Sequence, residues 1–322
     1  MMTNPCFNSK LASHMRELLL ERNASGFSTR DLLLSLKDFD AFIIEKSFDD
    51  GSFSQALADA WSIQRPTENK ASRNSRIGRM KLLAEYMDSM GLPMNVSFEF
   101  GSSERPKTYV PTREEASVLF SVIDSWNPIF GIPGYVSCAY PVLYRLYYCL
   151  GLRLNEAVTL QRKDVSFSCG TLYIRHSKGD KDRIVFVQND LLDLMRRYDD
   201  IVSVHLPGRQ WFFPSKTPGQ HPWKHNICRR FRLFWQMAFP DWIGKRPTVH
   251  SLRHAFVVHT VNDWVEDGKD ASILFPYLSR FLGHGSIQDT MYYYHLWDTE
   301  TGAFARFIEP PSAVEDETEG WL

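Results

Sequence analysis

Apolar side chains return every three or four positions between residues 7 and 92, the spacing of amphipathic helices. Polar breaks and capping residues divide this stretch into four predicted helices: residues 9–23, a helix after Ser28 that includes residues 32–44, residues 54–63 and residues 68–90. No strand pattern is present there. We therefore predict an all-helical first domain.

Residues 93–112 lose this periodicity and gather Pro, Gly and Ser, a composition typical of a linker. Thr112 followed by Glu115 predicts a capping box for the next helix. We place a domain boundary near residue 105. The predicted parts are a helical domain over 1–105, a second domain over 106–310 and an acidic, disordered tail over 311–322.

The second domain combines helices with a short β-rich region. Residues 171–176 and 183–187 are β-rich runs around the polar turn SKGDKD, which predicts a hairpin with Lys178 at its tip. Residues 206–222 are read as a loop. Predicted helices cover 113–125, 137–150, 189–200, 223–238, 249–266, 271–282 and 286–296. The expected fold is mainly α with a small β-sheet.

Composition indicates a globular protein of the cytosol. The 322 residues are 43% hydrophobic and 23% charged, enough for a substantial core and two domains. Five widely spaced cysteines indicate reduced thiols. The most apolar run, 135–152, is broken by Pro141 and Arg145, so it is read as buried and no membrane span is expected.

A net charge of −1 hides an uneven distribution. Residues 145–254 carry about 19 Lys and Arg against about 9 Asp and Glu, whereas the last 25 residues are acidic. On and before the fourth helix, a row of cations opposed only by Glu68 could follow a DNA backbone or simply form a solvated face. These cations are Arg65, Lys70, Arg73, Arg76 and Arg79.

The basic block also contains residues suited to attack on a phosphodiester. Arg153 and Arg253 each carry a planar, permanently charged guanidinium that can donate two hydrogen bonds to phosphate oxygens. Lys178 can donate a proton, and His250 can shuttle one near neutral pH. A Tyr from the run 292–294 could serve as the nucleophile if cations favour its phenolate. Taken singly, each of these residues is more typical of a core or a surface position than of a catalytic site.

Four segments together carry a specific resemblance. CLGLRLNEAVTL, SKGDKDRIVFV, HSLRHAF and LGHGSIQDTMYYYHL, in this order, resemble the signature boxes of the tyrosine recombinases, or phage integrases. The resemblance covers about residues 112–300, and the N-terminal helices are similar to that family's SAM-like core-binding domain. It implies that Arg153 and Arg253 hold the scissile phosphate and that Lys178 is the general acid. It also implies that His250 and His284 assist, and that Glu156 supports the site.

The resemblance selects Tyr293 as the nucleophile, because the family's Tyr lies nine residues after the His corresponding to His284. Neighbouring helical positions point about 100° apart, so only one of Tyr292, Tyr293 and Tyr294 can face the phosphate. Residues 206–222 and 264–277 are read as insertions relative to compact family members.

The implied activity is site-specific DNA recombination through a covalent 3′-phosphotyrosyl intermediate, in integration, excision or transposition of a mobile element. The expected partner is double-stranded DNA, bound by a tetramer of this chain or of related recombinases that exchange a C-terminal segment, here 297–308. No metal or other cofactor is expected, and the protein would lie with the nucleoid in the cytoplasm. A type IB topoisomerase and a catalytically silent DNA-binding regulator are the alternatives.

Overall fold

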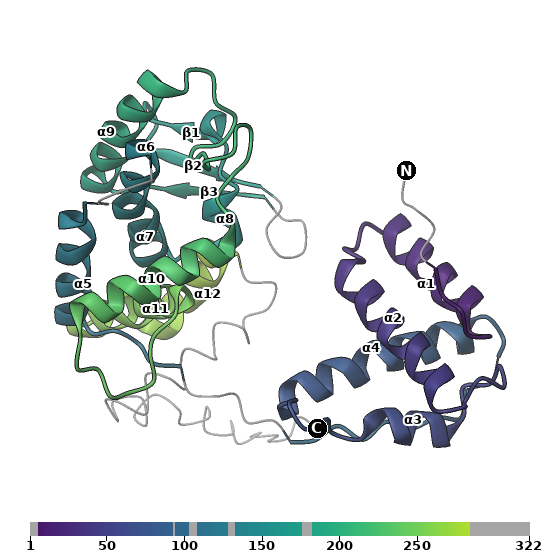
Figure 1. Cartoon of the computed structure of the whole chain (residues 1–322). Coiled ribbons are helices and arrows are strands. Elements are labelled where there is room, and N and C mark those ends of the chain that lie inside the picture. Colours follow the sequence, from purple (N-terminus) through teal and green to yellow (C-terminus); the bar gives the residue numbers. More distant parts are fainter. Residues whose placement is uncertain (1–5, 93, 103–107, 128–132, 176–181, 284–322) are drawn as a thin grey trace, which may run out of the picture. The chain divides into compact units, whose positions relative to one another are not determined.

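The computed structural model describes residues 6–92, 94–102, 108–127, 133–175 and 182–283. They form two compact units, each with its own hydrophobic core (Figure 1). Unit 1 lies within residues 1–106 and unit 2 within residues 107–322. The described residues are mainly helical, with one small sheet, which confirms the predicted fold class.

Unit 1 is a bundle of the four predicted helices, each within a few residues of its expected bounds. They are α1 (Ala12–Ala24), α2 (Arg30–Glu45), α3 (Gln55–Ser62) and α4 (Lys70–Ser89). The longest, α4, packs against the other three and buries Met80 and Leu83. On the other helices, Met15, Phe39 and Trp61 are fully enclosed. The apolar stripes seen in the sequence are therefore the core of this unit.

Part of the predicted linker is built into unit 1. The Ser97 backbone N–H donates to Gln55 Oε1 of α3 at 2.9 Å. Asn74 of α4 binds both backbone groups of Gly101, at 2.7 and 3.0 Å. Residues 94–101 thus run along the helices without forming a helix or strand of their own, because side-chain amides satisfy their backbone.

Unit 2 contains the remaining elements. They are α5 (Arg113–Ser125), α6 (Gly134–Ser137), α7 (Ala139–Leu150), α8 (Leu154–Val158), a 3-10 turn (Arg162–Asp164), β1 (Val165–Ser166), β2 (Thr171–Ile174), β3 (Arg183–Phe186), α9 (Asn189–His205), α10 (Lys224–Ala238), α11 (Val249–Glu266) and α12 (Ala271–Leu282). The predicted capping box of Thr112 and Glu115 is present at α5. The short elements α6, α8 and β1 were not predicted, because so few residues carry no readable periodicity.

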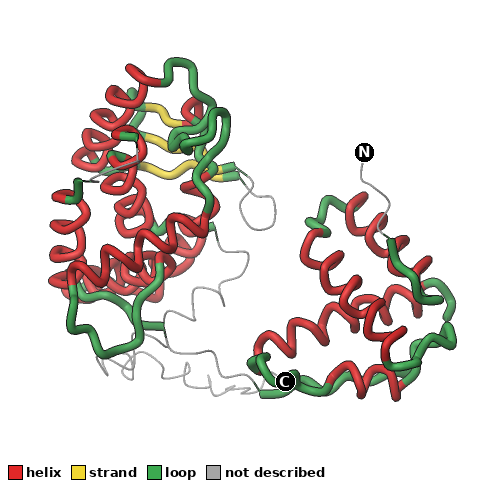
Figure 2. Tube along the Cα trace, in the orientation of Figure 1, coloured by secondary structure: helices red, strands yellow, loops and turns green. Residues whose placement is uncertain are grey.

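The sheet is antiparallel, in the order β1-β2-β3 (Figure 2). Thr171 pairs with Phe186 and Ile174 with Arg183, which confirms the predicted hairpin. Leu172 and Val185 face the core and are fully buried. The first residue of β3, Arg183, therefore lies at the end of the sheet next to the hairpin turn.

Helix α7 is the centre of unit 2 and packs against α5, α9 and α11. Leu143, Tyr144 and Tyr147 are buried, as expected for this apolar run. Pro141 lies in the first turn of α7, where a missing N–H breaks no helical hydrogen bond. No helix in the described part of the chain is long and apolar enough to cross a membrane.

The two predicted insertions differ in structure. Residues 206–222 form no helix, but Phe212 and Phe213 anchor them in the core. Residues 264–277 are mostly helical, because they contain the end of α11, a turn at Gly268 and the first half of α12. This region is therefore the end of one predicted helix and the start of the next, joined by a short turn.

Candidate functional site

The candidate site lies where the C-terminal ends of α7 and α12 meet the first turns of α11. Gly151 ends α7 in the left-handed conformation, with φ +58°. A Cβ at this position would lie 2.6 Å from Phe256 Cδ1 and 2.8 Å from Leu282 Cδ2. Glycine therefore provides both the turn and the close approach of the three helices.

Arg153 follows this turn and occupies the N-cap position of α8, three residues before Glu156. Its backbone N–H and its Nη1 each donate to Glu156 at 2.8 Å, and its Nη2 donates to the Gly283 carbonyl at 2.7 Å. A fifth of the Arg153 side chain reaches solvent. The start of α8 thus aims a partly exposed guanidinium at the end of α12.

Arg253, in the second turn of α11, is 1% exposed. Its Nη1 donates to the Gly151 carbonyl, and its Nη2 donates to the Leu282 carbonyl at 3.0 Å. Arg183 of β3 donates from Nε to the Phe281 carbonyl at 2.8 Å. A helix ends with carbonyls that lack intrahelical partners and carry partial negative charge, so cations bind there.

The consequence is that three guanidinium groups bind three consecutive carbonyls at the end of α12: Phe281 by Arg183, Leu282 by Arg253 and Gly283 by Arg153. The three arginines come from a strand, a helix and a helix cap that are far apart in the sequence. We call this set the arginine cluster.

Glu156 is the carboxylate within the arginine cluster, and 3% of its side chain is exposed. It accepts from Arg153 and also from Nη1 and Nη2 of Arg183, at 3.0 and 2.8 Å. Burial alone would raise the pKa of Glu156, but the hydrogen bonds and charges of Arg183 and Arg153 outweigh it and lower the pKa to about 2. Glu156 is therefore ionised at neutral pH.

His250 lies in the first turn of α11, one turn before Arg253, and its ring meets that of His254 edge-on, with centroids 4.5 Å apart. The residue as a whole is exposed, but desolvation by the surrounding protein is the largest influence on the pKa of its imidazole. This desolvation, reinforced by Arg253 and Arg153, lowers the pKa of His250 to about 4. The imidazole is thus neutral at pH 7 and can accept a proton.

Comparison with known proteins identifies this arrangement. Residues 134–300, just over half of the chain, match the phage integrase family. The chain belongs to the phage integrase family. A putative integrase/recombinase of Sinorhizobium fredii, y4rB, is 28% identical over 87% of this chain and 90% of its own. The tyrosine recombinase XerC of Chlamydia caviae is 24% identical over 76% of this chain and 74% of its own.

Solved structures show the same integrase fold. XerH recombinase bound to difH DNA, in a post-cleavage complex, aligns with a TM-score of 0.65 at 17% identity, over 96% of this chain and 92% of that one. The Tn1549 transposon integrase in complex with circular intermediate DNA aligns with a TM-score of 0.64 at 14% identity, over 87% and 94%.

Four of the integrase residues predicted from the sequence lie in the described structure and come together: Arg153, Glu156, His250 and Arg253. The others lie outside the described residues, namely Lys178, His284 and Tyr293 with its neighbours Tyr292 and Tyr294. The catalytic role of every residue in this set stays a prediction.

Sequence reasoning missed Arg183 and Gly151 as parts of this site. Arg183 was read only as the start of a strand, although its position directly after the polar hairpin turn could have drawn attention. Gly151 was read only as the turn before Arg153. Its close approach to α11 and α12 is a tertiary contact, so no local pattern reveals it.

In unit 1, the prediction that Arg76 contacts DNA is wrong for this structure. Arg76 is 6% exposed, and its Nε and Nη2 donate to the two carboxylate oxygens of Glu68 at 2.8 and 2.7 Å. Its guanidinium also lies over the Trp61 ring, 4.9 Å from the centroid. The reason is helical spacing, because Arg76 lies one turn before buried Met80 and so shares its inward face.

The other predicted DNA-binding cations are more accessible. Lys70 is exposed in the first turn of α4. Arg65 pairs with Asp38 at 2.9 Å on the surface. Arg73 donates to the Ser62 carbonyl at 2.6 Å, and Arg79 donates to the Ser35 hydroxyl at 2.8 Å. The exposed Arg65–Asp38 pair is of a kind that contributes little to stability, whereas the hydrogen bonds of Arg73 and Arg79 are partly buried.

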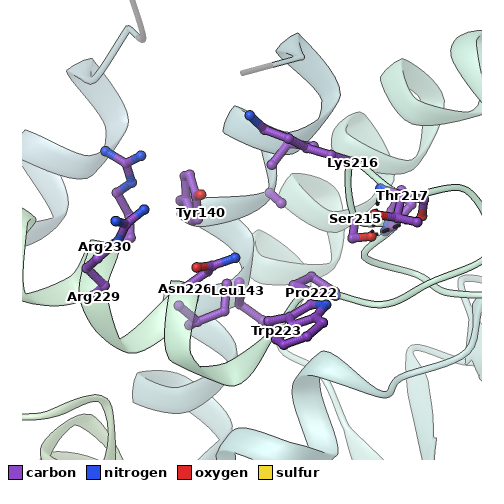
Figure 3. A pocket seen from close by; sticks show the side chains of 14 residues that line it. Tyr140, Leu143, Ser215, Lys216, Thr217, Pro222, Trp223, Asn226, Arg229 and Arg230 are labelled. Carbon is purple, nitrogen blue, oxygen red and sulfur yellow. Dashed lines mark hydrogen bonds between the residues drawn. The ribbon is translucent and has the colours of Figure 1, made fainter. Parts of the chain in front are cut away.

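Unit 2 also contains a cavity of about 330 Å³ between α7, α10 and residues 214–223 (Figure 3). Arg229 and Arg230 lie on one side of it, and Lys216 and Trp223 on the other. None of the arginine cluster lines this cavity. In the described part of the chain, no group of three or more His, Cys, Asp or Glu is placed to hold a metal ion.

Proposed function

We propose that this protein is a site-specific DNA recombinase that cuts and rejoins strands in the integration, excision or transposition of a mobile element. One observation carries the proposal. Arg153 and Arg253 donate to the consecutive carbonyls of Gly283 and Leu282, so their guanidinium groups lie close together. Two adjacent guanidiniums suit the two non-bridging oxygens of one phosphodiester.

In the proposed reaction, the Tyr293 hydroxyl oxygen attacks phosphorus while the bond from phosphorus to the 5′ oxygen breaks. The phenolic proton passes to His250, and Lys178 protonates the departing 5′ oxygen. A 3′-phosphotyrosyl bond and a free 5′-hydroxyl result. The 5′-hydroxyl of a partner strand then attacks the same phosphorus and releases Tyr293, so the energy of the phosphodiester is conserved and no ATP is consumed.

The electrostatics of the site favour this chemistry. The cluster contains three guanidinium groups and one carboxylate, and this excess positive charge attracts a phosphate and favours a phenolate. Desolvation is the main cause of the lowered pKa of His250, and repulsion from Arg253 and Arg153 adds to it; a bound phosphate offsets this repulsion, so the imidazole becomes a better proton acceptor when substrate is present. Arg253 is buried, so it reaches a phosphate only after its surroundings move.

Related structures support double-stranded DNA as the partner. XerH is bound to difH DNA, and lambda integrase was solved as a tetramer on a Holliday junction. We propose the same kind of assembly here, a tetramer of this chain or of related recombinases on two DNA sites, with residues 297–308 as the exchanged segment. Arg65, Lys70, Arg73 and Arg79 would contact the DNA backbone, and the protein would lie with the nucleoid in the cytoplasm.

The proposal is tested with nicked duplexes that tile the DNA on both sides of the gene. In such substrates the short strand downstream of the cut diffuses away, so covalent intermediates accumulate. Wild-type protein and the variants Tyr292→Phe, Tyr293→Phe and Tyr294→Phe are incubated with them in EDTA and separated on denaturing gels. We expect a protein–DNA adduct that only Tyr293→Phe abolishes.

Other outcomes separate the alternatives. If wild-type protein binds a duplex tightly and specifically but never forms an adduct, the enzyme proposal fails and a DNA-binding regulator is favoured. If an adduct forms and supercoiled plasmid is relaxed without any strand exchange between two sites, the topoisomerase alternative is favoured. Loss of the adduct with Tyr292→Phe or Tyr294→Phe alone would reassign the nucleophile.

A further inference from the structure

Arg183 is the member of the arginine cluster to which the proposed chemistry gives no role. It is the first residue of β3, on the strand that follows the hairpin turn containing Lys178. Its side chain is 11% exposed. All three guanidinium nitrogens donate within the protein, Nη1 and Nη2 to Glu156 and Nε to the Phe281 carbonyl.

This geometry differs from that of a phosphate ligand. Nη1 and Nη2 of Arg183 donate to the two carboxylate oxygens of Glu156, a bidentate arrangement with strong directional preference. Arg153 reaches the same carboxylate with a single nitrogen of its side chain and keeps its Nη2 on the Gly283 carbonyl. Among the hydrogen bonds and charges that lower the pKa of Glu156, those of Arg183 are thus larger than those of Arg153.

We propose that Arg183 is a positioning residue for strand cleavage, acting on Arg153 through Glu156 and on the end of α12 through the Phe281 carbonyl. This inference rests on the proposed function. One guanidinium joins the sheet, the start of α8 and the end of α12. The end of the sheet, the start of α8 that carries Arg153, and the end of α12 therefore keep one relative geometry.

Removing Arg183 should harm the chemistry more than DNA binding. Of its two described ion-pair partners, Glu156 would keep Arg153 and would draw that guanidinium away from the phosphate. The Phe281 carbonyl would lose its donor, and the end of α12 would loosen. A misplacement of about 1 Å costs on the order of 100-fold in rate, whereas affinity depends on many phosphate contacts spread over the duplex.

The experiment compares Arg183→Gln and Arg183→Lys with wild type on the nicked duplex. DNA affinity is measured by fluorescence anisotropy. Adduct formation is followed over a single turnover by quenching samples at successive times, with DNA at a saturating concentration. We expect both variants to bind DNA with dissociation constants within about 3-fold of wild type. The rate of adduct formation should be on the order of 100-fold lower for Arg183→Gln. The rate should fall less for Arg183→Lys, which keeps the charge but not the planar guanidinium.

The pH profile is a second readout, which general loosening of the fold would not move. Burial raises the pKa of Glu156, and Arg183 is the main group that counteracts this effect. Without Arg183, the pKa of Glu156 therefore rises from about 2 toward or above its ordinary value of 4.5. The cleavage rate of Arg183→Gln should therefore fall further as the pH decreases from 7 to 5. Glu156→Gln, which cannot titrate, should lack this additional fall.

Arg162→Gln is the matched control. Arg162 also binds a buried carboxylate in unit 2, donating from Nε to both oxygens of Asp199 at 2.7 and 2.8 Å, but it lies on the 3-10 turn and these hydrogen bonds join it to α9 rather than to α12. We expect its cleavage rate to stay within about 3-fold of wild type. Equal rates for Arg183→Gln and wild type, or equal losses for Arg183→Gln and Arg162→Gln, overturn the inference.

Hydrogen exchange separates failure of this inference from failure of the proposed function. If wild type forms no adduct, the recombinase proposal fails, and the positioning of α12 is judged from amide exchange at residues 278–283. There we expect at least about 10-fold faster exchange in Arg183→Gln and no change in Arg162→Gln. Unchanged exchange in Arg183→Gln would refute the link between Arg183 and α12.

Discussion

Replacing Gly151 by Ala tests whether the close approach of α7, α11 and α12 assembles the site. The added Cβ meets Phe256 Cδ1 at 2.6 Å and Leu282 Cδ2 at 2.8 Å, well inside normal contact. At φ +58° the substitution also places an L-residue in the left-handed region. Because the Gly151 carbonyl accepts from Arg253, any shift of this turn also moves the arginine cluster.

The magnitude follows from two contributions. Left-handed backbone costs a non-glycine residue about 1–2 kcal/mol. Overpacking a dense core by one methyl group costs about 1–3 kcal/mol more. Alanine also reduces the entropy of the unfolded chain, which offsets about 0.4–1 kcal/mol. We therefore expect Gly151→Ala to lower the free energy of unfolding of unit 2 by about 1–5 kcal/mol.

Gly268→Ala separates the two contributions. Gly268 follows α11 with φ +69°, and a Cβ there would have nothing within 4 Å. It carries the same backbone penalty and the same effect on the unfolded chain, so the difference between the variants isolates the steric cost. We expect Gly268→Ala to lose only about 1 kcal/mol or less.

The assay must distinguish the two units, which need not unfold together. Pulsed hydrogen–deuterium exchange along a urea series, read by mass spectrometry, follows peptides of α7, α11 and α12 separately from unit 1. Adduct formation on the nicked duplex gives the functional readout, and we expect a large loss for Gly151→Ala only. Equal stability losses for Gly151→Ala and Gly268→Ala would refute the steric reasoning.

Two further predictions concern charge. The pKa values of His250 and His254 are lowered to about 4 and about 3, whereas a His in the unfolded chain titrates near 6.5. Unfolding therefore takes up protons below pH 6.5, and the stability of unit 2 falls from there toward pH 4. His254→Gln should flatten this slope in urea titrations, and an unchanged slope would contradict the assignment. Arg76→Ala should destabilise unit 1 by roughly 3 kcal/mol, because Glu68 loses its buried partner. In the same thermal melts, replacing the exposed Lys70 by Ala should cost less than about 0.5 kcal/mol. Equal losses of stability in the two variants would contradict burial of the Arg76–Glu68 pair.

Local pattern was sufficient for most elements. The helices of unit 1 and the long helices of unit 2 follow from apolar spacing and capping residues, because a single amphipathic face must be buried wherever it packs. The hairpin between β2 and β3 follows from alternation around a polar turn. Arg76 is the instructive failure, since its charge indicated a surface position while its spacing from Met80 placed it on the buried face.

The sequence by itself determined the residue types of the site, their order and the family to which the chain belongs, because these depend on short motifs. Tertiary structure alone decided that Arg183, Arg253 and Arg153 bind three successive carbonyls of α12. It also decided that Glu156 is shared between two of them. The physical reason is that the partners of a helix end, and the charge balance of a buried carboxylate, come from chain segments that only the packed fold brings together.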